Sequence, residues 1–475
     1  MSSPALEAAR AALGDSQAWL VGGAVRDRLL GRDTADLDVV VESDPAQAAR
    51  AVARAGGHAA CFALSEEFGS WRVVARDRSW QLDVEPLRAA TLEQDLALRD
   101  FTINAIAEPL AGGAPIDPLG GLKDLDARRL RMAGPGAFVD DPLRVLRLVR
   151  LAVELDLAVD AGTSRSAVEY APGLAGVSAE RVFAELRRIV AAPRARAALE
   201  LMHELGVSTV VLPELERLRG VEQNRFHHLD VYGHTLEVLD RTIELTDPVG
   251  SWGSELSGML AANETKVRAM LHEPLADELS RGEALRWGAL LHDAAKPLTR
   301  EVRAGDGRVT FMGHDVRGAE LAREVLTRLR TSERLRAHVA ALVRHHLRLG
   351  FLVHEPQPLS RRTVFAYMSE CSPVEVDVTL LSVVDRLATR GDRAQEAIDA
   401  HLAVARTMLE DALRWRAQGP LQPLLRGDEL AHALAIPVGP KVGELLQELA
   451  AAQYAGELDT REQALVYART LIDNS

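Results

Sequence analysis

The chain has 475 residues, a net charge of −13, 47% hydrophobic residues and 26% charged residues. These proportions are typical of a globular protein with roughly two to four domains, and they exclude a disordered or fibrous chain. The acidic balance argues against a surface covered with nucleic-acid contacts, although a local basic groove is compatible with it. An aromatic content of 4% disfavours a protein that binds single strands by stacking.

The sequence predicts neither a membrane segment nor a secretory leader. No apolar run approaches the roughly 18 residues of a membrane-spanning helix, and Glu7 and Arg10 interrupt the N-terminal stretch. The two cysteines, Cys61 and Cys371, are too few for a disulfide framework or a thiolate zinc cluster. We therefore expect a cytoplasmic protein that has no membrane partner.

Short strands and helices alternate in the first part of the chain. Residues 18–31, AWLVGGAVRDRLLG, predict a strand, a Gly-Gly turn and a helix that begins at Val25. DLDVVV at 36–41 and WQLDVEPL at 80–87 predict further strands. This pattern is typical of an α/β head domain.

The pattern becomes helical after Asp141. Apolar residues recur on one face of DPLRVLRLVRLAVEL, at Leu143, Leu146, Val149 and Val153. Nearly all of the remaining chain has helical periodicity. The predicted domains are a head at 1–138, a helical neck at 139–220, a third domain at 221–400 and a helical tail at 401–475.

Two aspartates on one predicted strand are the first candidate site. Asp36 and Asp38 project from the same face of the strand, where both can hold the divalent cations that phosphoryl transfer uses. The turn at Gly22 and Gly23 allows backbone to approach a phosphate closely, and Arg26 can pair with phosphate oxygens. An isolated acid pair is often only solvated, but the preceding glycine turn and arginine favour a nucleotidyl-transfer site.

A third carboxylate is available on the next predicted strand of this region. Asp83 can complete the catalytic group, and Glu85 shares its strand face. A plain solvent-facing acid is an equally good interpretation of Asp83.

Four ordered motifs carry a family resemblance. LVGGAVRDRLLGR with ADLDVVV, LRDFTINAIA at 98–107, DPLGGLKDL at 117–125 and FVDDPLRVLRLVR at 138–150 resemble the bacterial class II tRNA nucleotidyltransferases. These are the CCA-adding enzymes and their poly(A) polymerase relatives. The resemblance implies a polymerase-β-type head with Mg²⁺, followed by helical neck, body and tail regions. It also implies tRNA as the partner, and CTP and ATP as nucleotide substrates.

The resemblance assigns roles to single residues. Asp36 and Asp38 match the metal-binding acids, and Gly23 and Arg26 match the triphosphate turn. Nucleotide contacts are implied for the R-D-x-x-x-N motif and for the acid and arginines after it: Arg99, Asp100, Asn104, Asp141, Arg144, Arg147 and Arg150.

Two of these assignments have a chemical basis and a structural alternative. Asp141 can accept from a base amine while Arg144 donates to a neighbouring acceptor, so this pair can select a base without a template. The three-residue spacing of Arg144, Arg147 and Arg150 alone would fit a solvated arginine face equally well. Asp100 could instead cap the helix that follows it.

The chain departs from the family pattern at two places. Leu98 stands where the family commonly has the first arginine of Arg-Arg-Asp. Only EPLRAATLEQDLAL, residues 85–98, separates the Asp83 strand from Arg99, whereas enzymes that add a full CCA usually have a longer flexible loop here. The short segment resembles CC-adding members, so the sequence leaves addition of the terminal adenosine open. A poly(A) polymerase is another alternative.

A second set of residues resembles the HD phosphohydrolase superfamily. The order His, His-Asp, Asp is carried by His234, His292, Asp293 and Asp385, and His314 and His346 can complete a binuclear site. Imidazoles and carboxylates together suit a transition metal that activates water. The resemblance implies phosphatase, phosphodiesterase or nucleotidase activity and a phosphate contact for Lys296. In a competing hypothesis this domain is the working enzyme and the head only binds nucleotide.

The predicted tail resembles the family's tRNA-elbow cradle. Gly439 and Gly443 flank Lys441, and this arrangement suits a helix N-terminus close to a phosphate. A loop–helix turn that binds no ligand is the alternative.

Overall fold

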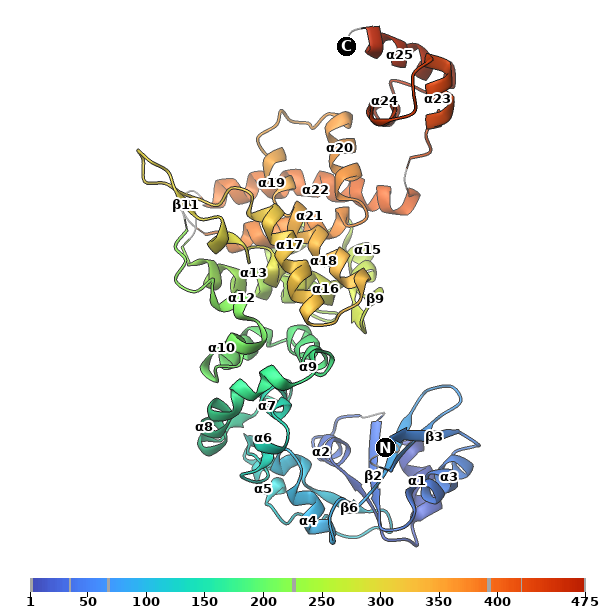
Figure 1. Ribbon diagram of the computed structural model, residues 1–475, viewed down its shortest axis with the longest axis vertical. Helices are drawn as coiled ribbons and strands as arrows, with labels where there is room; N and C mark the ends of the chain where they lie inside the picture. The colour runs from blue at the N-terminus through green and yellow to red at the C-terminus, as the bar shows by residue number, and fades with distance from the viewer. Residues whose placement is uncertain are drawn as a thin grey trace. The chain divides into compact units, whose positions relative to one another are not determined.

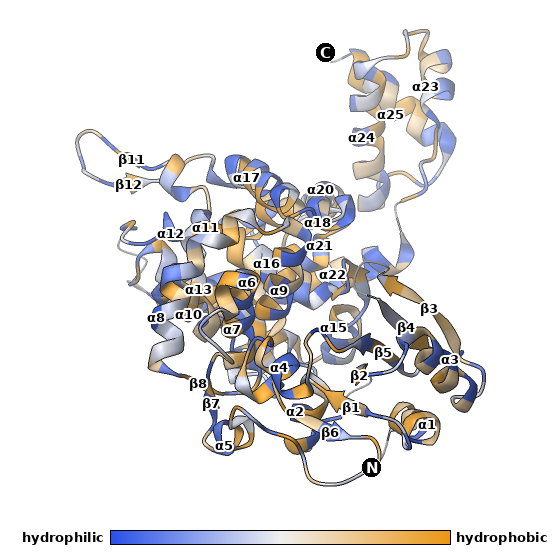
Figure 2. Ribbon diagram, turned by 60° about the horizontal axis from the view of Figure 1, so that its bottom comes forward, coloured by the Kyte–Doolittle hydropathy of each residue, from blue (hydrophilic) through white to orange (hydrophobic). Residues whose placement is uncertain are grey.

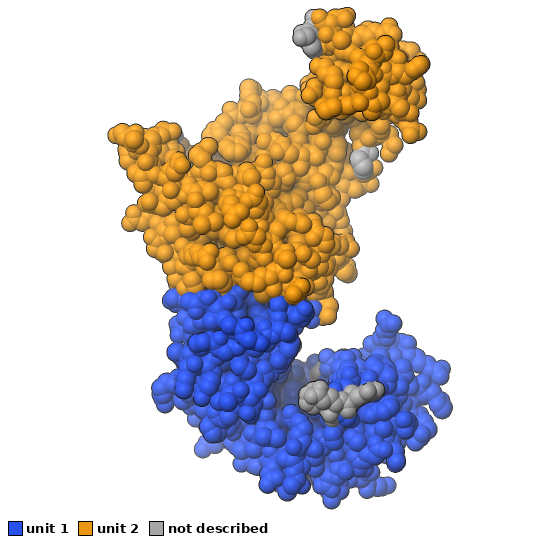
Figure 3. Space-filling model, viewed as in Figure 1, with its two compact units in different colours: residues 1–211 blue, residues 212–475 orange. Residues whose placement is uncertain are grey.

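The computed structural model describes residues 3–33, 36–65, 69–223, 228–390, 394–419 and 421–473 (Figure 1). It divides into two compact units, residues 1–211 and 212–475 (Figure 3). Within the described ranges, no helix combines the length and the hydropathy needed to cross a membrane.

The described part of the first unit begins with a mixed six-stranded sheet in the order β3-β4-β5-β2-β1-β6. Its strands are β1 Ala18–Val21, β2 Asp36–Val41, β3 Ala60–Ser65, β4 Ser70–Val74, β5 Gln81–Pro86 and β6 Ala107–Pro109. β2 and β5 are parallel, and their register sets Asp38 opposite Asp83. The α/β head predicted from the sequence is confirmed.

Both faces of this sheet are covered, because successive strand residues point to opposite sides. Val39 joins the core formed with helices α1 (Pro4–Leu13) and α3 (Pro45–Ala55). Val40 joins a second cluster with helix α4 (Leu92–Ala97). In Figure 2, β1 and α1 are drawn largely in the hydrophobic colour, in agreement with their burial.

Helices and short strands complete the first unit. They are α2 Gly23–Leu29, η1 Thr102–Asn104, α5 Gly121–Asp126, β7 Arg129–Leu130, α6 Ala137–Asp140, α7 Leu143–Glu154, β8 Ala158–Val159, α8 Ala161–Tyr170, η2 Ala171–Gly176, α9 Ala179–Ala191, α10 Ala195–Glu204 and α11 Ser208–Val211. The predicted apolar face of α7 is buried. The predicted start of α2 at Val25 is wrong by two residues, because Gly22 has a positive φ of 72° and the helix begins directly after it.

The second unit is a helical assembly. Its elements before the tail are α12 Pro213–Glu216, α13 Val231–Thr246, α14 Ser254–Leu260, α15 Glu264–Leu271, β9 Pro274–Ala276, β10 Leu279–Ser280, α16 Arg281–Leu291, η3 Lys296–Leu298, β11 Glu301–Val302, β12 Val309–Thr310, α17 His314–Arg328, α18 Glu333–His345, α19 Arg348–Leu352, α20 Arg361–Cys371, α21 Glu375–Ala388 and α22 Ala394–Gln418. Helices α16 and α21 are buried on nearly all sides, as expected of central helices.

The C-terminal helices form a small core of their own. They are α23 Gly427–Leu434, α24 Pro440–Ala455 and α25 Arg461–Asp473, and they share the buried residues Leu430, Leu445 and Ala464. Arg362 of α20 ties this group to the rest of the unit, because its guanidinium lies 2.6 Å from Glu457.

Candidate active sites

Four acids gather where β2 and β5 run side by side. Asp36 and Asp38 lie on β2, while Asp83 and Glu85 lie on β5. Burial, followed by the charge of Glu85, raises the pKa of Asp38 to about 6, and Asp83 and Asp36 act in the same direction. A cluster of carboxyl groups that is costly to ionise attracts cations, so this donor set fits a divalent ion with oxygen ligands.

Asp83 is held by a cross-strand arginine. Arg72 of β4 donates from Nε and Nη2 to the two carboxylate oxygens of Asp83, both at 2.7 Å. Asp83 thus lies beside Asp38 but already has a bidentate partner, and its catalytic role stays a prediction.

The glycine turn lies directly against Asp38 and Arg99. A Cβ added to Gly22 would lie 3.0 Å from Arg99 Nη1 and 3.3 Å from Asp38 Oδ2. A side chain there would crowd both groups, and the positive φ at Gly22 disfavours one in any case. The structure therefore brings together three residues that the sequence predicted for one site.

A chain of hydrogen bonds connects the turn to helix α7. Arg26 pairs with Asp27 and donates from Nη1 to Asn104 Oδ1 at 2.7 Å. Asn104 donates to Asp100 Oδ1 at 2.9 Å, and Arg147 donates to Asp100 Oδ2 at 3.0 Å. Burial alone would raise the pKa of Asp100, but the charge of Arg147 and the hydrogen bond from Asn104 hold it below its usual value.

Asp141 and Arg144 both have partners within the protein. Arg181 Nη2 lies 2.6 Å from Asp141 Oδ2. Arg144 donates to the carbonyl oxygens of Leu98 at 2.9 Å and Ala137 at 3.1 Å. A base that pairs with Asp141 and Arg144 has to replace these contacts.

Arg150 differs from the other arginines of α7. It is buried, and it donates to Glu185 of α9 at 2.5 Å and to Glu154 at 2.8 Å. This ion pair anchors α7 to α9, and the nucleotide contact expected for Arg150 stays a prediction.

One buried residue of this region, Asp95, was not found from the sequence. Its Oδ1 accepts from the backbone N–H and Nε of Arg88 at 2.9 and 3.2 Å, and its Oδ2 lies 3.5 Å from Arg99 Nη2. The available signal was its position four residues before Arg99, which places the two side chains on one helix face.

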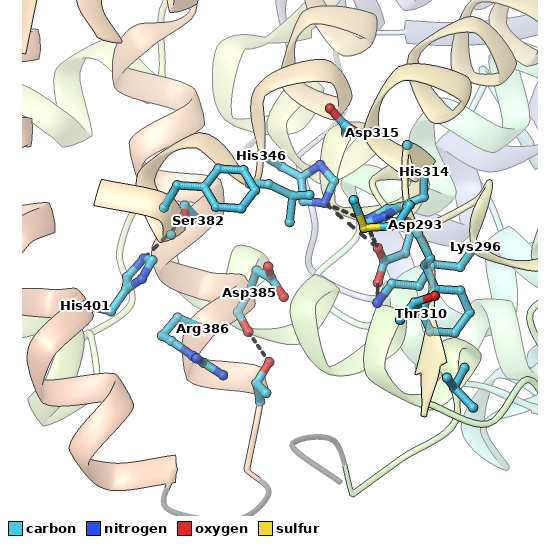
Figure 4. Close-up of a pocket in the computed structure, with 18 of the residues that line it drawn as sticks. Asp293, Lys296, Thr310, His314, Asp315, His346, Ser382, Asp385, Arg386 and His401 are labelled. Carbon is cyan, nitrogen blue, oxygen red and sulfur yellow. Dashed lines mark hydrogen bonds and ion pairs between the residues drawn. The ribbon is translucent and has the colours of Figure 1, made fainter. Parts of the chain in front are cut away.

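The second site brings together all of its predicted ligands. His234 lies on α13, Asp385 lies on α21, and the others lie at helix ends, namely His292 and Asp293 after α16, His314 at the start of α17 and His346 after α18. Two groups have ligand atoms close enough to hold a metal ion, and they share Asp293: His234, His292 and Asp293, and Asp293, His314 and His346. Figure 4 shows Asp293, His314, His346 and Asp385 around one pocket.

Asp293 lies between the histidines. Its Oδ2 is 3.1 Å from His292 Nε2 and 3.7 Å from His234 Nε2. Its Oδ1 is 3.4 Å from His314 Nε2 and 3.9 Å from His346 Nε2. Such a shared carboxylate is well suited to bridging two cations.

Backbone contacts orient the imidazoles. Nδ1 of His292, His314 and His346 each lies 2.7 Å from a carbonyl oxygen three residues earlier. A carbonyl only accepts, so Nδ1 carries the proton and Nε2 is left to bind a metal. The donor set therefore fits a pair of transition-metal ions.

Lys296 is bound to this cluster. Its Nζ lies 2.7 Å from Asp293 Oδ2 and donates to Gln223 at 2.7 Å. Burial alone would raise the pKa of Asp293, but the charge that His292 carries when it is protonated, and the charge of Lys296, hold it well below its usual value. The predicted phosphate contact of Lys296 stays a prediction.

A cavity of about 530 Å³ opens in front of the cluster. Beside the ligands, its walls include Arg308, Phe311, Phe351, Arg386 and His401. Sequence reasoning missed Arg386 and His401, although Arg386 directly follows the predicted ligand Asp385.

The class of this chain is a polymerase-type head followed by an HD domain. Three family models match the chain: "Poly A polymerase head domain" at residues 18–131, "Probable RNA and SrmB- binding site of polymerase A" at 156–218 and "HD domain" at 231–390.

Relatives cover almost the whole chain. The chain is 36% identical over 458 residues to the A-adding tRNA nucleotidyltransferase of Deinococcus radiodurans, with 95% of each chain covered. It is 34% identical over 455 residues to the CC-adding tRNA nucleotidyltransferase of Thermus thermophilus, covering 95% of this chain and 92% of the other. The fold is similar to the Bacillus stearothermophilus CCA-adding enzyme in complex with CTP, with a TM-score of 0.64, 21% identity and 100% of both chains covered. The chain belongs to the tRNA nucleotidyltransferase family, and the family and fold class predicted from the sequence are confirmed.

Proposed function

We propose that this protein adds cytidines from CTP to the 3′ end of tRNA and stops before the terminal adenosine. The proposed substrates, tRNA and CTP, place the reaction in the cytoplasm. The observation that carries this proposal is the short, folded segment between β5 and Arg99.

This segment is part of the head core. Thr91 Oγ1 caps α4 by accepting from Gln94 N at 3.3 Å. Leu92 and Leu96 are buried in the cluster that contains Val40. The resemblance noted in the sequence gives full CCA-adding members a longer flexible loop at this place. An anchored helix favours a site that stays in its CTP-selecting form.

The residues of the head have distinct tasks in this reaction. The Gly22–Gly23 backbone and Arg26 hold the triphosphate, and Asp100 and Asn104 face the ribose. Asp36 and Asp38 would hold Mg²⁺, which lowers the pKa of the tRNA 3′-hydroxyl and neutralises phosphate charge when bound. Base choice is assigned to Asp141 and Arg144, with Arg147 holding Asp100 in place.

The neck and tail supply the RNA contacts in this proposal. The neck is residues 139–220, and the RNA-binding family model matches 156–218 within it. The tail is residues 401–475, where α24 begins at Pro440 directly after Gly439. The exposed start of this helix next to Lys441 is suited to a phosphate of the tRNA.

A-addition is the second candidate, and the Deinococcus radiodurans relative favours it.

Transcripts that end before the CCA, after the first C and after the second C are incubated with CTP alone or ATP alone, and the products are sized on a gel. We expect CTP to extend the first two RNAs up to CC and ATP to extend none. Addition of one A to the CC-ended RNA would contradict the stop, and long A tails would indicate a poly(A) polymerase.

We further propose that the HD site is a metal-dependent phosphohydrolase that uses transition-metal ions. The convergence of four histidines and two aspartates supports it. The test is metal analysis of purified protein, followed by hydrolysis of a nitrophenyl phosphate ester after EDTA treatment and reloading with Mn²⁺, Co²⁺ or Ni²⁺. If the Asp293→Asn variant has the same metal content and the same hydrolysis rate as the wild-type protein, this proposal is refuted.

A further inference from the structure

Helix α21 presents two consecutive residues to the HD cavity. Asp385 lies 3.0 Å from His234 Nε2 in the ligand cluster, and Arg386 lines the same cavity (Figure 4). Within residues 228–390 and 394–419, no side chain pairs with the Arg386 guanidinium, and its Nε is buried without an acceptor. A buried guanidinium nitrogen without a partner is costly, so an anion would stabilise it.

Arg386 stands where two cavities meet. A second cavity of about 580 Å³ shares Gly350, Arg386, Thr389 and His401 with the first. Burial, with the charge of Arg386 adding to it, lowers the pKa of His401 to about 4, so His401 is neutral at pH 7. Among the described residues that line the second cavity, the one acid is Glu396, which is exposed on α22. The walls thus leave Arg386 as a positive group beside the ligand cluster.

We infer that Arg386 binds a second phosphate group of the hydrolase substrate, so that the HD site prefers nucleotides with phosphates on two different hydroxyls. This inference rests on the proposed hydrolase function. A guanidinium binds phosphate oxygens in a bidentate manner, and its place next to Asp385 sets it beside the reacting phosphate. Two kinds of substrate carry phosphates at both O3′ and O5′: a free nucleoside 3′,5′-bisphosphate, and the last nucleotide of an RNA that ends in a 3′-phosphate.

The reaction of such a substrate is a hydrolysis. The oxygen of water bonds to the phosphorus of the 3′-phosphate, the bond from phosphorus to O3′ breaks, and O3′ leaves with a proton from the water. The products are inorganic phosphate and a nucleotide with a free 3′-hydroxyl. Because Arg386 binds the 5′-phosphate, the bisphosphate binds with its 3′-phosphate toward the ligand cluster.

The test is equilibrium binding by calorimetry to the full chain in EDTA, which separates the role of Arg386 from catalysis. Adenosine 3′,5′-bisphosphate is compared with adenosine 3′-phosphate for wild type, Arg386→Gln and Arg386→Lys. The control is Arg323→Gln, which removes an exposed arginine of α17 that pairs with Glu333 at 2.6 Å. We expect a preference of about tenfold for the bisphosphate in wild type and control, lost in Arg386→Gln and partly kept in Arg386→Lys. The absence of a preference in wild type, or its persistence in Arg386→Gln, would overturn the inference.

A second measurement identifies the source and separates the two proposals. With Mn²⁺, KM is measured for the free bisphosphate and for a short RNA that ends in a 3′-phosphate, in wild type and Arg386→Gln. A KM that rises in Arg386→Gln for only one substrate identifies that source and supports the inference. If no metal restores hydrolysis, the hydrolase proposal fails, while the binding preference still decides whether Arg386 forms an anion site.

Discussion

At the scale of single residues, Asp38 combines a proposed metal-binding role with an electrostatic cost. The pKa of Asp38 is raised to about 6 in the folded protein, against 3.8 for an unperturbed aspartate. Between these values the folded state binds more protons than the unfolded state, so the contribution of Asp38 to stability falls as pH rises from about 4 to about 6 and is then constant.

Asp38→Asn is therefore expected to abolish nucleotide addition and yet to stabilise the metal-free head. The gain grows through this pH range and reaches at most roughly 3 kcal/mol. Thermal unfolding in EDTA at pH 5 and pH 7.5 measures it, together with CTP incorporation. The control is Glu93→Gln, an exposed acid of α4, which should change neither quantity. A lower melting temperature for Asp38→Asn at pH 7.5 would contradict the electrostatic account.

Asp95 is expected to act as a positioning residue for Arg99. Asp95→Asn keeps an acceptor for the Arg88 N–H but removes the charge that faces Arg99. We predict a KM for CTP raised about tenfold with a smaller change in kcat. In an Arg99→Lys background the same change should have little further effect, because the two residues form one unit.

The control for Asp95 is Arg88→Met, which leaves the backbone hydrogen bond intact. It should leave the KM for CTP close to wild type. Asp95 would only stabilise the backbone at Arg88 if Arg88→Met and Asp95→Asn raise the KM for CTP equally. The same conclusion would follow if the effects of Asp95→Asn and Arg99→Lys on KM are additive.

Side chains with a strong chemical signature could be predicted from the sequence. His314 and His346 join the HD cluster as the superfamily resemblance indicated, and Asp36, Asp38 and Gly22 share one site. Partners fixed by tertiary packing could not be predicted. The Arg72–Asp83 pair depends on the register of β4 against β5, and the Arg150–Glu185 pair depends on how α7 packs on α9.

At the scale of elements, helix α4 connects packing in the head to Arg99, a predicted nucleotide contact. Leu96 is fully buried in the cluster on one face of the sheet, and Arg99 lies two residues beyond Ala97, the last residue of α4. We expect Leu96→Ala to destabilise the head by about 2–4 kcal/mol and to raise the KM for CTP. Hydrogen exchange of residues 92–97 and steady-state kinetics measure the two effects.

A matched control lies two residues away. Leu98 is 41% exposed, so Leu98→Ala should alter neither exchange nor KM appreciably. Equal effects of Leu96→Ala and Leu98→Ala would show that burial of α4 is not the cause.

Local periodicity accounts for the elements that the sequence predicted well. The apolar spacing of α7 and the β-branched run of β2 follow from which faces are buried. The order of the strands in the sheet follows from long-range pairing, which no local pattern encodes. The start of α2 was predicted two residues too late. Gly22, with its positive φ, both ends the turn and caps the helix, so no separate turn residue precedes the helix.

At the scale of the whole molecule, the two candidate active sites lie in different compact units. Each unit has a core of its own, so their chemistry should be separable. Asp38→Asn should abolish CTP incorporation and leave phosphate-ester hydrolysis intact, and Asp293→Asn should do the reverse. Both activities are measured on the same preparations of full-length protein, and unfolding curves verify folding.

Two other outcomes would contradict two independent active sites. Loss of hydrolysis in Asp38→Asn would show that both activities depend on the head. Hydrolysis by a wild-type protein that incorporates no CTP would indicate that the head only binds nucleotide.

The internal partners of Asp141 and Arg144 have a consequence for fidelity. In the proposed reaction, an incoming base has to compete with Arg181 for the acid and with carbonyl oxygens for the arginine. A base that matches both groups recovers what it displaces, whereas one that matches a single group leaves a deficit of about one charged hydrogen bond, roughly 1.5–3 kcal/mol. If Asp141 and Arg144 select the base as proposed, their internal contacts set a threshold that mismatched nucleotides fail to reach, and accuracy comes at the expense of tight binding.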